Sequence, residues 1–186
     1  MNTTLHHPKC TVTVQIETVL EAYQLPDIPL VYPDGELPNG MASLVRLIIR
    51  SADAAAQLAL VCPPCCCHAA VNGDQLLVVQ FDLLTLISLP EGRIIQRRLM
   101  DCPGGCLGLY PLVDGWLIHG ECAIHRLDRE LQLLWEYYGA DIFASVTGKD
   151  AFTLTPDRIL LWDFEDNYYE LDLDGNQVKF IEKASV

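Results

Sequence analysis

The strongest constraint on the fold is an internal repeat in which a turn aspartate is followed by a run of strand-forming residues. The three clearest copies begin at Asp74, Asp114 and Asp157, which are 40 and 43 residues apart. In each copy a short apolar segment precedes the aspartate, and two more strand-like segments separated by a turn follow it. The pattern predicts four short strands per repeat and an all-β fold.

An earlier copy of the repeat is predicted around Asp34, which lies 40 residues before Asp74. Downstream of it, residues 44–50 and 57–61 have the apolar, β-branched composition of strands. The intervening stretch 36–42 contains Pro and Gly and does not resemble a regular strand, so the first repeat is expected to be degenerate or at an edge. We therefore expect one domain over residues 1–186, with an N-terminal segment 1–26 and four repeats starting near residues 27, 66, 106 and 150.

Four short strands at a period near 40 residues are typical of a propeller blade. A four-stranded blade has two apolar faces and buries them only by stacking on neighbouring sheets. We expect a small or partial β-propeller of about four blade-like repeats of 40–43 residues, either closed or as a half-ring that pairs into a homodimer. A β-sandwich is the alternative.

The N-terminal segment, which ends at Pro26, differs from the repeats. Apolar residues between Ile16 and Tyr23 recur at helical spacing, and the proline would end the helix. The spacing predicts a short amphipathic helix over residues 13–24. The alternation of apolar and polar residues at its start equally suits a strand.

The repeat that begins at Asp114 resembles those of PQQ-like β-propellers. Their pattern is an Asp-Gly pair, a strand, an aliphatic segment ending in Leu-Asp and a terminal Leu-Leu-Trp, matched here by residues 114–118, 123–128 and 133–137. A looser match at 157–178 extends the resemblance to about residues 68–183. The resemblance implies the fold alone, because the sequence has no matching quinone or metal motif.

The charge of the chain limits its partners. It has 25 Asp and Glu against 12 Lys and Arg, a net charge of −13. Nucleic-acid binding requires clustered basic residues, and the densest such group is Arg93, Arg97 and Arg98, so no nucleic-acid partner is expected. No stretch approaches the roughly 18 apolar residues of a membrane-spanning helix, so no membrane partner is expected either. An acidic surface attracts basic proteins.

Eight cysteines without a signal-peptide pattern predict a cytoplasmic protein with reduced thiols. Cys62 and Cys102 each lie 12 residues before a repeat aspartate, so the pairs Cys62/Cys65 and Cys102/Cys106 occupy equivalent loops of consecutive repeats. Equivalent loops of adjacent blades lie close together, and four thiolates at this spacing suit a tetrahedral zinc site, with His68 as an alternative ligand. The competing interpretation is that the cysteines are buried apolar residues and no cofactor is bound.

The sequence has no G-x-S-x-G, H-E-x-x-H or phosphate-loop motif, so catalysis is not expected. The leading prediction is a non-enzymatic scaffold that binds another protein, for example an acidic inhibitor of the immunity-protein type for a basic partner. A zinc-binding protein that uses the cysteine loops, and a small enzyme with a central propeller pocket, are the alternatives. The predicted partner surface combines acidic and aromatic residues of the last two repeats: Trp135, Tyr137, Asp163, Glu165, Asp166 and Tyr168.

Overall fold

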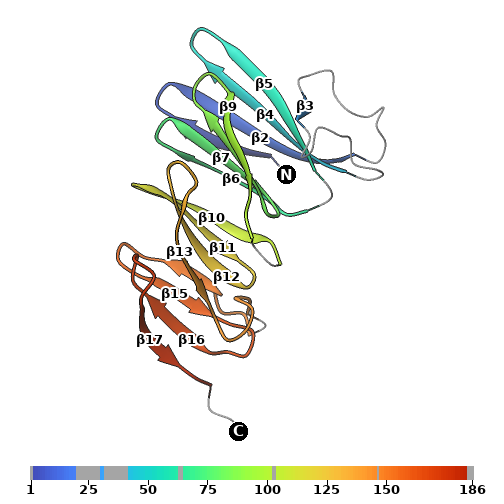
Figure 1. Ribbon diagram of the computed structural model, residues 1–186. Helices are drawn as coiled ribbons and strands as arrows, with labels where there is room; N and C mark the ends of the chain where they lie inside the picture. The colour runs from blue at the N-terminus through green and yellow to red at the C-terminus, as the bar shows by residue number, and fades with distance from the viewer. Residues whose placement is uncertain are drawn as a thin grey trace. The chain divides into compact units, whose positions relative to one another are not determined.

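The computed structural model describes residues 2–19, 30–31, 42–62, 65–101, 104–145 and 147–183. All helices and strands assigned within these ranges are strands, as the all-β prediction requires (Figure 1). None of the described residues belongs to a helix long and apolar enough to cross a membrane. Contacts divide the chain into two compact units, Met1–Met100 and Asp101–Val186, and each is described by itself.

The first unit contains two sheets. One has the strand order β1-β2-β4-β5-β3 and is antiparallel except where β3 pairs with β5, and the other is the antiparallel sheet β6-β7-β8-β9. The strands are β1 (Asn2–His7), β2 (Cys10–Val19), β3 (Leu30–Val31), β4 (Ala42–Ser51), β5 (Ala55–Cys62), β6 (Cys67–Asn72), β7 (Gln75–Gln80), β8 (Leu83–Ser88) and β9 (Arg93–Leu99).

A strand occupies most of the segment for which the sequence predicts an N-terminal helix. β2 pairs with β4 along its whole length, and its alternate residues Val12 and Val14 are buried in the core. The helix prediction is wrong up to residue 19, because the ladder to β4 satisfies the backbone and the period-two alternation places one face of β2 inside. Residues 20–24 lie outside the described part of the chain.

The first sheet starts at Asn2, so it begins well before residue 27, where the sequence places the first repeat. The strands predicted at 44–50 and 57–61 are present as the long hairpin β4-β5. Asp34 and residues 36–41 lie outside the described residues. The remaining three starting points, near 66, 106 and 150, agree with the first residues of β6, β10 and β14.

The second unit contains two four-stranded antiparallel sheets, ordered β10-β11-β12-β13 and β14-β15-β16-β17. Each sheet is an uninterrupted meander, as expected when every strand pairs with its neighbour in sequence. The strands are β10 (Cys106–Leu112), β11 (Gly115–Gly120), β12 (Ala123–Asp128), β13 (Leu133–Tyr138), β14 (Phe152–Leu154), β15 (Ile159–Trp162), β16 (Tyr168–Leu171) and β17 (Gln177–Ile181).

The repeats also share fine structure. The pairing of the third and fourth strands shifts register at Leu86/Ile87, Arg126/Leu127 and Glu170/Leu171, just before the turn in each sheet. In the last two sheets that turn is closed by an aspartate. Asp128 accepts hydrogen bonds from the backbone N–H groups of residues 130 and 132, and Asp172 does the same from residues 174 and 176.

Each unit is held together by the apolar faces of its two sheets. In the first unit Val12, Leu47 and Leu60 of one sheet pack with Leu76 and Val78 of the other. In the second unit the cluster contains aliphatic and aromatic side chains of both sheets and of the connecting loop: Leu117, Ile124, Phe143, Ile159, Leu161, Tyr169 and Leu171. Each fully buried side chain of this size contributes about 1.5–3 kcal/mol.

Candidate functional site

A groove of about 440 Å³ lies in the second unit, where turns from one end of its two sheets meet. The β10-β11, β14-β15 and β16-β17 turns contribute to it, together with side chains of β12 and β13. Its size is at the lower end of the range for binding pockets and fits a few side chains of a partner. The lining residues are Leu112, Val113, Asp114, Arg126, Leu134, Trp135, Thr155, Pro156, Leu173 and Asp174.

Apolar side chains stand exposed at this groove. Val113 is 96% exposed and Leu134 is 54% exposed. Between the two sheets, the indole Nε1–H of Trp135 donates a hydrogen bond to the carbonyl oxygen of Leu173 at 3.1 Å, which fixes the ring. Gly175, at φ +84°, lies against this ring, because a Cβ there would be 2.6 Å from it. The groove is therefore a preformed apolar surface rather than a gap between mobile side chains.

A buried cation lies behind the groove. The guanidinium of Arg126, whose side chain is 5% exposed, donates to the Trp116 carbonyl oxygen at 3.1 Å, to the Leu127 carbonyl oxygen and to the carboxylate of Asp114. Asp114 is 75% exposed and neutralises this cation at the mouth of the groove. Its removal would leave a buried charge unpaired, which costs about 3–5 kcal/mol.

The turns around the groove are rich in acidic residues. Residues 101–186 contain 16 Asp and Glu against 6 Lys and Arg, so most of the chain's negative charge lies in this unit. Hydrogen bonds from the side chain and backbone of Asn176 lower the pKa of Asp172, which keeps this carboxylate ionised. The acidic residues of these turns are Asp114, Asp128, Glu130, Asp157, Asp172 and Asp174.

A second cluster lies in the first unit, where β5 ends and β6 begins. The Sγ atom of Cys62 is 3.3 Å from that of Cys65, which is 3.9 Å from that of Cys67, and all three lie within 4.8 Å of one another. The side-chain N–H of Gln80, a residue 1% exposed, donates to Cys62 Sγ at 3.0 Å. The hydroxyl of Ser43 accepts a hydrogen bond from the backbone N–H of Cys65 at 3.4 Å.

The three thiols share hydrogen bonds unequally. Cys62 and Cys67 stabilise the thiolate of Cys65, which lowers the pKa of Cys65 to about 4. The hydrogen bond to Cys65 raises the pKa of Cys62 to about 12, and hydrogen bonds to its two neighbours raise the pKa of Cys67. The cluster therefore concentrates negative charge on one sulfur.

No family model matches the chain, and no curated protein matches it. Solved structures do match. The AfRom2 CNH domain, a propeller-type structure, has a TM-score of 0.50 and 8% identity over 98% of this chain and 54% of that one. Hydrazine synthase from Kuenenia stuttgartiensis has a TM-score of 0.53 and 13% identity over 87% of this chain and 52% of that one. BamB from Moraxella catarrhalis has a TM-score of 0.39 and 13% identity over 83% and 63%.

The fold is that of small, propeller-like blades. The likeness concerns the fold alone, because the identities are low. The chain spans about half the length of the first two structures that it matches.

The structure brings together part of the predicted metal set. Cys62 and Cys65 are in contact as predicted, and Cys67, which the sequence analysis does not select, joins them. Cys106 lies in the second unit, where its thiol donates to the Gly108 carbonyl oxygen at 3.3 Å, and Cys102 lies outside the described residues. His68 follows Cys67 on β6, so its side chain points to the other face of that sheet.

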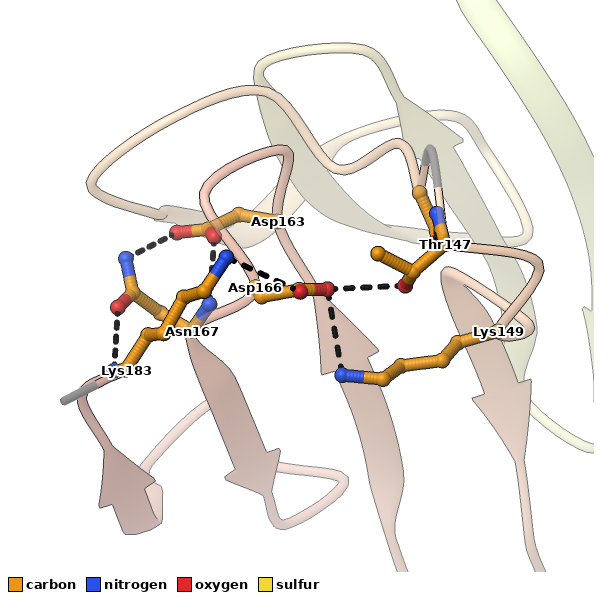
Figure 2. Close-up of polar contacts among 7 residues, drawn as sticks. Thr147, Lys149, Asp163, Asp166, Asn167 and Lys183 are labelled. Carbon is orange, nitrogen blue, oxygen red and sulfur yellow. Dashed lines mark hydrogen bonds and ion pairs between the residues drawn. The ribbon is translucent and has the colours of Figure 1, made fainter. Parts of the chain in front are cut away.

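The predicted partner surface is divided by the structure. Asp163 is fully buried and cannot belong to a surface, because Asn167 and the hydroxyl of Tyr169 donate three hydrogen bonds to its carboxylate (Figure 2). Asp166 accepts hydrogen bonds from Thr147 at 3.0 Å and Lys149 at 3.2 Å, which lower its pKa, and Lys149 is the larger cause. These acids build the β15-β16 turn, at the end of the sheet away from the groove.

The other predicted surface residues are separated from one another. Trp135 alone lines the groove. Glu165 is exposed in the β15-β16 turn, Tyr137 donates its hydroxyl hydrogen bond to Gln177, and Tyr168 donates to the neighbouring Glu170 at 2.9 Å.

A signal in the sequence could have located the groove. An apolar residue or proline immediately precedes an aspartate in each of its three turns, at 113–114, 156–157 and 173–174.

Proposed function

We propose that the protein is a non-enzymatic binding scaffold, and that the groove of the second unit takes an apolar segment of a basic partner protein. One observation carries the proposal: a preformed apolar surface, with Val113 96% exposed, lies among acidic turns. Exposed apolar side chains beside a fixed aromatic ring are typical of the centre of an interface. The acidic turns favour Lys or Arg at its rim.

The division of labour between the two parts of the groove follows from their chemistry. Burying Val113 and Leu134 against a partner removes apolar surface from water, which supplies affinity. The exposed carboxylates of Glu130, Asp157 and Asp174 stay near solvent, where charge pairs contribute little affinity but increase the association rate. An inhibitor of the immunity-protein type is one version of this scaffold.

The test starts from a displayed library of random peptides selected on the full chain. We expect the selected peptides to carry Lys or Arg beside a large apolar residue, and their Kd, measured by fluorescence anisotropy, to increase with salt. The double variant Val113→Ser/Leu134→Ser should weaken binding by roughly 10- to 100-fold, since two exposed apolar contacts of about 1 kcal/mol or more are lost.

The control variant is Leu107→Ser, which removes an apolar side chain 40% exposed at the other end of the same sheet. It should leave the Kd unchanged. Peptides without enriched basic residues, or peptides that bind equally to the Val113→Ser/Leu134→Ser variant, would contradict the proposal.

We also infer that the repeats are of the PQQ-like kind. The support is Trp135 of the Leu-Leu-Trp segment, which binds the Leu173 carbonyl oxygen in the turn of the following repeat and so joins successive blades. Trp135→Phe keeps the aromatic ring but loses this hydrogen bond, and should cost about 1 kcal/mol in urea denaturation. The cytoplasmic location stays a prediction that cell fractionation checks.

A further inference from the structure

The thiols of Cys62, Cys65 and Cys67 come from two different sheets of the first unit. Cys62 is the last residue of β5, Cys67 is the first residue of β6, and Cys65 lies in the connection between them. The cluster is partly withdrawn from solvent, since Cys62 is buried and the other two are intermediate in exposure. Whatever binds all three sulfurs therefore ties the two sheets together at this point.

The spacing of the sulfurs fits a metal ion. A tetrahedral zinc ion with Zn–S bonds of about 2.3 Å separates its sulfur ligands by about 3.8 Å. The observed separations are 3.3 Å between Cys62 and Cys65 and 3.9 Å between Cys65 and Cys67, with the third within 4.8 Å. Shifts of less than about 1 Å would thus place all three sulfurs on one ion.

The surroundings of the thiols suit metal-bound thiolates. The buried amide of Gln80 donates to Cys62 Sγ at 3.0 Å, and N–H donors of this kind orient ligating sulfurs and stabilise their charge. Its Oε1 atom is buried and has no hydrogen-bond partner in the described part of the chain. The Ser43 hydroxyl holds the backbone of Cys65 in the same place.

We propose that Cys62, Cys65 and Cys67 form a zinc site, with the fourth position open to water or to a donor from outside these residues. Binding displaces the protons of those thiols that are still protonated, so zinc affinity increases with pH. Cys66 is not a ligand, although it lies between two of them, because its side chain is exposed and its sulfur is not part of the cluster. The ion acts as a clamp between β5 and β6 and stabilises the first unit by mass action.

The experiment uses the full chain, reduced and stripped of metal by a chelator, and titrates it with Zn²⁺ and with Co²⁺. We expect one equivalent of zinc, protection of three thiols from a thiol reagent, and a thiolate charge-transfer band with cobalt. Cys62→Ser, Cys65→Ser and Cys67→Ser should each weaken zinc binding by at least about 100-fold, and Gln80→Leu by about 10-fold. Urea denaturation of each metal-free variant separates loss of the site from loss of the fold.

Cys66→Ser and Cys106→Ser are the matched controls, and both should bind zinc as tightly as the unchanged protein. Three results would overturn the proposal. The first is the absence of stoichiometric zinc binding by the reduced protein. The second is a Cys66→Ser variant as defective as Cys67→Ser, which would indicate unspecific binding to the run of cysteines. The third is loss of binding in Cys106→Ser, which would indicate a different set of ligands.

Discussion

Replacement of Tyr169 by Phe tests whether the buried carboxylate of Asp163 organises the β15-β16 turn. Tyr169 is 3% exposed, and its hydroxyl donates to Asp163 Oδ2 at 2.7 Å, beside two donors from Asn167 at 2.8 and 2.9 Å. A hydrogen bond to a charged group contributes about 1.5–3 kcal/mol, and the carboxylate keeps two of its three donors in the variant. We therefore expect Tyr169→Phe to lower the free energy of unfolding by about 2 kcal/mol.

The assay is urea denaturation followed by fluorescence, with Tyr138→Phe as the matched control. Tyr138 is 49% exposed, and its hydroxyl hydrogen bond to Glu136 is long, at 3.3 Å, and also exposed. Its replacement should change the free energy of unfolding by less than about 0.5 kcal/mol. In a double-mutant cycle with Asp163→Asn, the coupling energy to Tyr169→Phe should approach the cost of the single tyrosine replacement.

A second readout follows from the pKa of Tyr169. Burial and the hydrogen bond to Asp163 raise it to about 12, so the folded protein keeps the phenol proton at a pH where the unfolded chain, with a pKa near 10, loses it. This contribution to stability is complete below pH 10 and is lost as the pH rises from 10 to 12. A Tyr169→Phe variant that matches Tyr138→Phe in stability, or that shows the same loss above pH 10 as the unchanged protein, would refute the reasoning.

Two further predictions concern glycine and histidine. Gly175→Ala should cost clearly more than Gly148→Ala, which pays about 1 kcal/mol for its φ of +79° alone, because the new Cβ at residue 175 also meets the Trp135 ring at 2.6 Å, whereas nothing lies within 4 Å at Gly148; equal costs in urea denaturation would contradict the packing argument. Burial lowers the pKa of His125 despite the opposing charges of Glu136 and Asp101, so the unfolded chain binds a proton that the folded protein does not and stability should decrease as the pH falls below about 6.5. His125→Gln should flatten this dependence between pH 7 and 5, and an unchanged slope would show that other groups cause it.

The sequence alone was sufficient for the repeated strands of residues 67–181. Their period-two pattern and their turn aspartates are local properties, since a four-stranded meander pairs each strand with its neighbour in sequence. The same reasoning was wrong for β2, where residues 13–19 fit a helix and a strand equally. The pairing with β4, more than 20 residues away, decided between the two, and nothing in the segment itself records that pairing.

The candidate sites depended more strongly on tertiary structure. In the sequence Asp163 is one acid in an exposed-looking loop, and only the approach of Asn167 and Tyr169 makes it a buried acceptor. Cys67 becomes a neighbour of Cys62 because two strands of different sheets meet at their ends. The groove likewise forms only where three turns, separated by some 40 and 20 residues, come together. Hydrophobic periodicity specifies the strands because it acts between near neighbours, whereas burial, charge pairing and metal geometry arise from contacts between residues far apart in the chain.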